Sequence, residues 1–365
     1  MELDSSGCSA PGCWSLHQMP AHTLHQTHAP EPGSVKPLPA ARWLDLRGPA
    51  QDAFHAQAAA RRDQVHGRRV FLRAVVELSN YCRQNCDYCG MRRGNKSLPR
   101  FRAERDTLRR LLFDHLPASV TDINIQTGED PVAVREIVLP LLAELAAAGR
   151  WGLSVCLGTL DGPLYDALRQ AGAGYYIIKL ETGNEAHFRG IHAPGSLARR
   201  LEAIHQLAAT GWLVSSGFIM GLPGQTEAIL DETLALLAGL PLAGSSVSPF
   251  IPGEDTPLAG AAPAHVDQSL NALAALRLAR PDHVIPAVSA FSILAPDGYS
   301  RALRAGANLA TINMTPDAWR GSYQLYSKDR IIMSESRVLR AIEDAGLEPS
   351  RRGLIDSLRR SPCPI

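Results

Sequence analysis

The chain has 365 residues, of which 45% are hydrophobic, and a formal net charge of +1. This length and composition allow a large buried core, either in one barrel-sized domain or in two ordinary domains. A nearly neutral chain offers no general basic field to nucleic acid or to an anionic membrane, so neither partner is expected.

The first 39 residues are rich in Pro, His, Ser and Ala and show no apolar period, which predicts a disordered extension over residues 1–39. We interpret the histidines and cysteines of this stretch as members of a flexible tail rather than as metal ligands. Residues 40–69 form a predicted N-terminal helical segment, with helix from Trp43 to about Arg68.

From Val70 onward, short apolar runs alternate with longer helical ones, which indicates a parallel sheet wrapped by helices. The predicted helices include 131–148, 164–171, 197–210, 226–240 and 265–278. Eight strands are predicted, near 70–78, 122–127, 153–158, 175–181, 213–220, 245–251, 284–289 and 308–313. The sequence therefore predicts an α/β fold, a TIM-type (β/α)8 barrel over residues 70–347, followed by a C-terminal tail over 348–365.

Three cysteines, Cys82, Cys86 and Cys89, follow the first predicted strand in the run SNYCRQNCDYCGMRRGNK, with the spacing C-x3-C-x2-C. Thiolates hold iron-sulfur clusters or zinc. A structural zinc site normally draws its ligands from two separated pairs, and no second pair stands downstream. Three thiolates on one short loop are typical of a 4Fe-4S cluster with one open iron, while zinc and free thiols remain alternatives.

Glycine-rich and polar segments follow several other predicted strands. In a parallel barrel the active site is built at the carboxyl ends of the strands. Each segment also has an interpretation as a turn or a helix start, for example Asp130 as a helix cap. Together with the cysteine loop they predict a site at one rim, formed by residues 126–131, 179–184, 221–226 and 249–258.

The seven cysteines do not form the even, dense pattern of a secreted disulfide scaffold. The chain shows no basic and then apolar leader at its start and no uncharged apolar run of membrane-spanning length. A cytoplasmic location is therefore expected.

The cysteine loop, with Tyr88 before its last cysteine, resembles the signature of the radical S-adenosylmethionine (SAM) enzymes. The resemblance implies that Cys82, Cys86 and Cys89 hold a 4Fe-4S cluster whose fourth iron is chelated by the amino and carboxylate groups of SAM. It also implies reductive cleavage of SAM to methionine and a 5'-deoxyadenosyl radical. The implied partners are a small-molecule substrate and an electron donor such as ferredoxin or flavodoxin.

From about Val70 to Leu347, the chain is most similar to the family of the FeFe-hydrogenase maturation enzyme HydE. The segments that carry this resemblance, in the same order, are NYCRQNCDYCGMRRGNK, QTGEDP, GLPGQT, SPFIPGEDTPL, AGAN and TPDAWRGSYQLY. The 3-methylornithine synthase of the pyrrolysine pathway and biotin synthase resemble the chain more distantly.

The resemblance to this family also implies roles for single residues at the SAM end of the barrel. Tyr88 would lie beside the adenine, and Glu181 would contact SAM. Arg200 would pair with the SAM carboxylate, in keeping with its forked donor geometry. The implied contacts to the SAM amino group are Thr127, Gly128 and Glu129, and those to the adenine edge are Gly217, Ile219 and Gly221.

At the substrate end the chain departs from that family. Lys179 replaces a typical arginine and loses its planar fork. Val288 and Ser289 stand where paired threonines are expected, Thr311 replaces a methionine, and Cys363 stands alone where some members carry a C-terminal cysteine cluster. The candidate substrate residues are Lys179, Ser289, Thr311, Tyr323 and Tyr326.

These departures leave three functional hypotheses. The first is a HydE-like enzyme of hydrogenase cofactor assembly. The second is a radical SAM mutase or synthase that acts on an amino acid or another small metabolite. The third is a non-catalytic iron-sulfur or zinc-binding protein.

Overall fold

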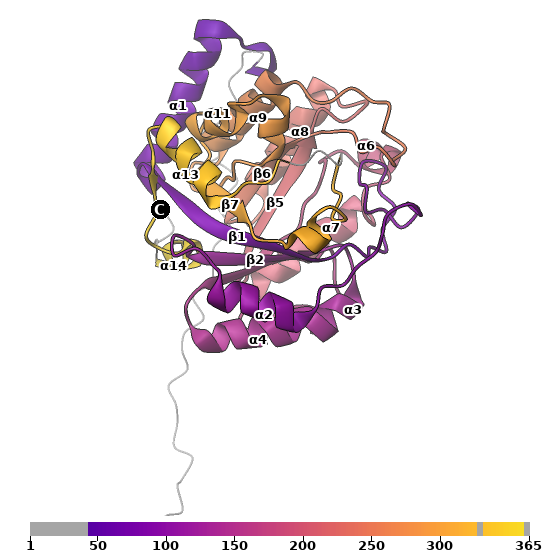
Figure 1. The fold of residues 1–365 in the computed structure, drawn as a ribbon. Coiled ribbons are helices and arrows are strands. Elements are labelled where there is room, and N and C mark those ends of the chain that lie inside the picture. The colour runs from indigo at the N-terminus through magenta and orange to yellow at the C-terminus, as the bar shows by residue number, and fades with distance from the viewer. Residues whose placement is uncertain (1–42, 327–330, 361–365) are drawn as a thin grey trace, which may run out of the picture.

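The computed structural model describes residues 43–326 and 331–360, and its centre is a curled parallel sheet surrounded by helices (Figure 1). The strands follow the order β6-β5-β4-β3-β2-β1-β7, and β8 pairs with the start of β1. The predicted parallel α/β barrel is confirmed. The strands are β1 (Arg69–Ser79), β2 (Asp122–Thr127), β3 (Gly152–Cys156), β4 (Tyr175–Ile177), β5 (Leu213–Met220), β6 (Gly244–Pro249), β7 (Leu309–Asn313) and β8 (Glu348–Pro349).

Helices connect successive strands and cover the outside of the sheet (Figure 1). A short 3-10 turn η1 (Trp43–Asp45) and α1 (Gly48–His66) precede the barrel. The other helices are α2 (Arg105–Asp114), α3 (Pro131–Ala133), the π-helical turn η2 (Val134–Val138), α4 (Leu139–Ala148), α5 (Gly162–Gln170), α6 (Glu185–Gly190), α7 (Leu197–Ala209), α8 (Glu227–Gly239), α9 (Val266–Ala279), α10 (Ala290–Leu294), α11 (Gly298–Arg304), α12 (Asp317–Arg320), α13 (Glu335–Asp344) and α14 (Leu354–Arg360).

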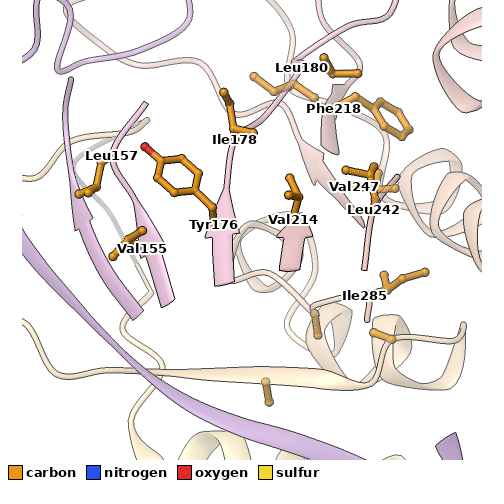
Figure 2. Packing of buried hydrophobic residues seen from close by; sticks show 14 of the residues in the cluster. Val155, Leu157, Tyr176, Ile178, Leu180, Val214, Phe218, Leu242, Val247 and Ile285 are labelled. Carbon is orange, nitrogen blue, oxygen red and sulfur yellow. The ribbon is translucent and has the colours of Figure 1, made fainter. Parts of the chain in front are cut away.

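Side chains alternate along the strands between an apolar outer face and a more polar inner face. Val155, Tyr176 and Val214 lie on neighbouring strands and pack in the apolar layer beneath the helices (Figure 2). The next residues along the same strands, such as Cys156 and Ser215, face the interior cavity instead. This period of two, which a pleated strand imposes, places polar groups inside the barrel without breaking the core.

The prediction of a seventh strand near residues 284–289 is wrong, because this segment is not a regular strand. Val284 pairs singly with Gly244, and Pro286 pairs singly with Leu309. Proline lacks the backbone N–H that a strand ladder needs. The segment still forms one backbone hydrogen bond on each side, from Ser245 N to Val284 O (3.0 Å) and from Asn308 N to Ile285 O (2.8 Å). It therefore bridges β6 and β7.

Two further predicted elements are shorter or less regular than the sequence suggested. The strand predicted over 175–181 is regular only over Tyr175–Ile177. Beyond it, Glu181 takes the left-handed conformation at φ 68° and forms a single bridge with Phe218. The helix predicted over 131–148 passes through η2 before α4. Pro140 has no N–H to donate to the carbonyl four residues earlier. The wider π-helical turn accommodates the missing hydrogen bond.

The end of the chain that the structure describes packs against the amino-terminal side of the barrel. Asp122 accepts hydrogen bonds from the backbone N–H groups of Leu354 (2.7 Å) and Ile355 (3.3 Å), which begin α14. Leu354 packs with Phe71, Val284 and Leu309. The predicted extension 1–39 lies outside the described residues, and among the helices that are described none is long and apolar enough to cross a membrane.

Candidate active site at the carboxyl rim of the barrel

A cavity of about 390 Å³ opens at the carboxyl ends of the strands and extends into the barrel. Most of the residues that the sequence predicts for the site line this cavity. They are Cys82, Cys86, Tyr88, Cys89, Thr127, Gly128, Glu129, Lys179, Glu181, Arg200, Ile219, Ser289, Thr311, Tyr323 and Tyr326. Gly217 and Gly221 do not line it, because Gly217 faces Ser246 on β6 and Gly221 packs against Ala264.

The cysteine loop between β1 and α2 is held by one arginine that acts on the backbone. Arg100 donates hydrogen bonds to the carbonyl oxygens of Asn80 (2.6 Å), Met91 (2.9 Å), Arg92 (2.7 Å) and Asn95 (3.1 Å). These carbonyls lie on both sides of the three cysteines. The loop is therefore shaped before any ligand binds, which lowers the ordering cost of metal binding.

Cys86 is buried, Cys82 and Cys89 are half-buried, and the three thiols are close enough to affect one another's pKa. Burial raises the pKa of Cys82, and burial together with the neighbouring thiols raises the pKa of Cys89 to about 12 and that of Cys86 still higher. Thiolates at these positions therefore need a strong positive centre.

The spacing of these thiols matters for the choice between zinc and a cluster. Within residues 43–326 and 331–360, no three Cys, His, Asp or Glu side chains converge closely enough to hold a single metal ion. A tetrahedral zinc ion requires such convergence. Three thiols on one loop match the donor set of a 4Fe-4S cluster that keeps one iron open.

Gly128, directly after β2, lets the second rim segment approach the cysteine loop. A Cβ atom on Gly128 would overlap the carbonyl oxygen of Tyr81 and lie 2.9 Å from Cβ of Cys82. The next residue, Glu129, donates a backbone hydrogen bond to Sγ of Cys82 at 3.4 Å. Only glycine permits this approach, which fixes Cys82 relative to β2.

The carboxylate of Glu129 is the centre of a buried hydrogen-bond network. Its Oε1 accepts from Nη2 of Arg200 (3.1 Å) and from the backbone N of Thr159 (3.0 Å), while its Oε2 accepts from Nε of Arg83 (3.1 Å) and from Gln84. Arg200 also donates to the carbonyls of Pro194 (3.3 Å) and Lys179 (3.2 Å). Three of the five guanidinium N–H groups of Arg200 are thus used, which leaves two for a ligand in the cavity.

Glu181 combines backbone strain with an unsatisfied carboxylate oxygen. Its φ of 68° is unfavourable for a residue with a side chain and is typical of functional sites. Its Oε2 is buried and lies 3.4 Å from Nζ of Lys179, but accepts no hydrogen bond from the residues that the structure describes. Lys179 balances the charge of this carboxylate, and Oε2 keeps an unused acceptor position for a ligand that carries N–H or O–H groups.

The candidate substrate residues lie in two places, inside the barrel and beside the cysteine loop. The hydroxyl groups of Ser289 and Tyr326 form a hydrogen bond of 2.9 Å, and Nζ of Lys179 donates to Oγ of Ser248 at 2.9 Å. Tyr323 lies nearer to the cysteine loop than expected, since it packs against Met91 and Leu98. These contacts place Lys179 within the barrel and Tyr323 beside the loop.

Sequence reasoning missed Arg73, which lies on β1 and lines the cavity. The side chain is 8% exposed, and its Nε donates to Oγ1 of Thr311 at 3.1 Å. Among the described residues no carboxylate forms an ion pair with Arg73. The residue opposite Arg73 on β2 is Asp122, whose carboxylate accepts hydrogen bonds from the start of α14. The signal in the sequence was one arginine within the otherwise apolar run Val70–Val76.

This fold and site match a class of known proteins. Residues 76–237 match the sequence model of the Radical SAM superfamily. That range begins in β1 and ends in α8, so it includes the cysteine loop, the Glu129 network and Glu181. The class is therefore that of the radical SAM enzymes.

Individual proteins are similar over nearly the whole barrel. The FeFe hydrogenase maturase subunit HydE of Thermotoga maritima is 32% identical over 84% of this chain and 89% of its own length. The 3-methylornithine synthase of Methanosarcina barkeri is 26% identical over 82% of this chain and 86% of its own length. The chain therefore belongs to the radical SAM superfamily and, within it, to the family that includes this HydE subunit.

Similarity to solved structures supports the same fold. The crystal structure of methylornithine synthase (PylB) superimposes with a TM-score of 0.77 over 87% of this chain and 94% of that chain, at 24% identity. The cofactors of the superfamily are a 4Fe-4S cluster and SAM. The three spaced thiols and the unsatisfied carboxylate of Glu181 fit these two groups.

Proposed function

We propose that this protein is a HydE-like radical SAM enzyme of FeFe-hydrogenase H-cluster maturation, which acts on a small anionic substrate inside the barrel. Cys82, Cys86 and Cys89 would hold the 4Fe-4S cluster, which would supply the electron for cleavage of SAM to methionine and a 5'-deoxyadenosyl radical. The observation that carries the proposal is the position of the three thiols at the rim of a cavity whose mainly apolar wall carries the cations Arg73, Lys179 and Arg200 and three glutamates. The 32% identity with the HydE subunit supports the maturation role.

The protein's contribution at the SAM end is to bind and orient the methionine part. Arg200 has two unused N–H groups for a carboxylate, and Glu181 has an acceptor oxygen for an ammonium group. Thr127, Gly128 and Glu129 approach from β2, and Tyr88 and Ile219 contribute apolar surface for the adenine. The roles of Gly217 and Gly221 are indirect, since both allow neighbouring segments to pack closely.

The inner wall of the barrel favours a substrate with negative charge. Arg73 directs a buried guanidinium to the cavity, and Lys179 adds an ammonium group held by Ser248 and Glu181. Arg73 forms no ion pair with the residues that the structure describes, and an anionic substrate would give its buried guanidinium a direct partner. Thr311, Ser289 and Tyr326 provide hydroxyl groups for orientation.

Mutation of a cluster ligand tests the proposed cofactor chemistry. The Cys86→Ala variant should lose the visible absorption of the reconstituted cluster and all 5'-deoxyadenosine formation from SAM. Cys156→Ala is the matched control, because Cys156 lines the same cavity but lies outside the cysteine loop. Cluster absorption and SAM cleavage that survive in Cys86→Ala would refute the assignment of Cys86 as a cluster ligand. A wild-type protein that binds metal but cleaves no SAM would instead favour a non-catalytic metal-binding protein.

The maturation role needs a separate test. Expression of the chain in a cell that lacks its own HydE but retains the other maturation proteins should restore hydrogenase activity. An electron donor such as ferredoxin or flavodoxin is proposed to supply the electron in the cell. Failure to restore activity while SAM cleavage is normal would direct the search to other substrates.

A second candidate function is a mutase or synthase that acts on an amino acid. The pairing of Lys179 with Glu181, together with Arg73 in the barrel, offers cationic and anionic groups suited to an amino acid's two termini. The 26% identity with 3-methylornithine synthase also supports this candidate. Addition of single amino acids to the reduced, SAM-loaded enzyme should then raise 5'-deoxyadenosine formation above the uncoupled background for one of them.

A further inference from the structure

We propose that the outer face of the cysteine loop is the docking surface for an acidic one-electron carrier protein. The inference rests on the proposed function, because only a reductively activated cluster requires such a partner. The surface, here called the basic loop face, consists of Tyr81, Arg93, Lys96 and Arg100 of the loop together with Val132 of α3.

The charge of the loop is the first observation. Residues 80–102 contain six basic side chains, namely Arg83, Arg92, Arg93, Lys96, Arg100 and Arg102, and one acidic side chain, Asp87. The local formal charge is therefore +5 in a chain whose total is +1. Such concentration in one short segment creates a directional field that attracts an acidic partner.

Three of these six basic side chains form ion pairs within the protein, and the other three do not. Arg83 pairs with Glu129 (3.1 Å), Arg92 with Asp87 (3.4 Å) and Arg102 with Asp130 (2.7 Å). Arg100 binds backbone carbonyls, and Arg93 and Lys96 are exposed; these three form no ion pair with any residue that the structure describes. Their positive charges remain available to a partner at the surface.

Exposed apolar side chains gather at the same end of the barrel. In the described ranges 43–326 and 331–360, four large hydrophobic residues are exposed. Tyr81 (39%) and Val132 (40%) lie at this end outside the cavity, while Leu325 (37%) lines the cavity itself. Tyr81 directly precedes the ligand Cys82, and Arg102 lies over its ring at 4.3 Å. A small apolar centre within a basic surface is typical of protein docking sites.

Access to the cluster also favours this face. SAM and substrate would fill the cavity on the inner side of the cysteines, so a protein that delivers an electron must approach from outside. The cysteine loop lies beside α3 and α6 at the outer edge of the barrel, on the side opposite α13 (Figure 1). In the transfer the carrier loses one electron and the cluster gains it, with no bond formed between the two proteins.

A pair of charge-reversal variants tests the docking surface on the reconstituted full-length enzyme. The variant Arg93→Glu/Lys96→Glu should raise the KM for a reduced flavodoxin at least about tenfold in SAM cleavage and should weaken its dependence on ionic strength. The control is Arg337→Glu/Arg340→Glu on α13, which makes the same change in net charge on an exposed helix across the barrel. The control should keep the wild-type KM.

Chemical reduction separates this proposal from the proposed function. With excess dithionite in place of flavodoxin, both variants should form 5'-deoxyadenosine at the wild-type rate. An unchanged KM for flavodoxin in the loop variant, or an equal rise in both variants, would overturn the docking surface. A lower rate with dithionite in the loop variant would also overturn it, since the residues would then act on the cluster. Absence of SAM cleavage by wild-type protein with dithionite would instead refute the proposed function.

Discussion

Arg200 on α7 and Glu129 after β2 form a buried ion pair, with Nη2 3.1 Å from Oε1 and both side chains no more than 5% exposed. The resemblance to HydE assigns these two residues to opposite ends of the amino acid part of SAM. In the structure they bind each other. The carboxylate of Glu129 thus holds the guanidinium of Arg200 in place, and the two remaining N–H groups of Arg200 stay available to a SAM carboxylate.

Replacement of Arg200 by lysine should weaken SAM binding at least about tenfold, which corresponds to about 1.4 kcal/mol. Lysine keeps the positive charge but cannot bind Glu129, two backbone carbonyls and a ligand at the same time. Calorimetric titration of the reconstituted enzyme with SAM measures the effect. Arg83→Lys is the control, because Arg83 also contacts Glu129 but is 48% exposed, and should change the affinity less than about threefold. Wild-type affinity in Arg200→Lys would show that Arg200 is only a structural residue.

The variant Gly128→Ala should lose its cluster although no ligand is changed. The added methyl group would overlap the carbonyl of Tyr81 and press on Cβ of Cys82, and backbone atoms cannot move aside as a flexible side chain can. The cysteine loop should therefore shift away from β2. Iron content and visible absorption after reconstitution measure the loss. Gly190→Ala is the control because a Cβ at Gly190 meets no atom within 4 Å, and normal iron content in Gly128→Ala would contradict the prediction.

Elements with strong local signals were predictable from the sequence. The helix expected at 197–210 is found at Leu197–Ala209, where Ser196 caps it through the backbone N of Arg199 at 3.2 Å. The first strand, expected at 70–78, is found at Arg69–Ser79. Local composition determines these elements, because caps and apolar runs act on neighbouring residues.

Contacts between distant segments were not predictable in the same way. The pairing of Arg200 with Glu129 joins residues 71 positions apart, and no local pattern encodes it. Arg73 belongs to the site only because its face of β1 turns inward, and the closure of the barrel determines which face that is. The segment 284–289 had the composition of a strand, but Pro286 limited it to single contacts with its neighbours.

His283 should make the stability of the protein depend on pH below neutrality. This residue is fully buried, and its Nδ1 lies 2.8 Å from Oγ of Ser245. Burial, with the charges of Arg280 and Arg277, lowers the pKa of His283 to about 3, whereas the unfolded chain has a histidine pKa of about 6.5. The unfolded state then binds more protons below pH 6.5, so this stabilising contribution is complete above pH 6.5 and is lost as the pH falls toward 3.

The expected size of this effect at His283 is about 2 kcal/mol of unfolding free energy between pH 7 and pH 5. Denaturant unfolding of wild type and His283→Gln at both pH values measures it. Glutamine does not titrate, so the variant should lose about 2 kcal/mol less than wild type over the same range. Equal losses in the two proteins would show that His283 is not the group responsible.

Glu181→Gly should stabilise the fold and at the same time abolish tight SAM binding. Glu181 holds φ at 68°, and glycine adopts this conformation without the cost of about 1–2 kcal/mol that a side chain imposes. The change also removes the ion-pair partner of Lys179, but Lys179 keeps its hydrogen bond to Ser248 and is 23% exposed, so this loss is smaller than the relieved backbone strain. We therefore expect a higher Tm together with a loss of at least about tenfold in SAM affinity. His192→Gly is the control, since His192 has φ 46° but carries an exposed side chain outside the cavity, and it should leave SAM affinity unchanged. A lower Tm for Glu181→Gly would show that its side chain stabilises the ligand-free fold, and unchanged SAM affinity would remove Glu181 from the SAM site.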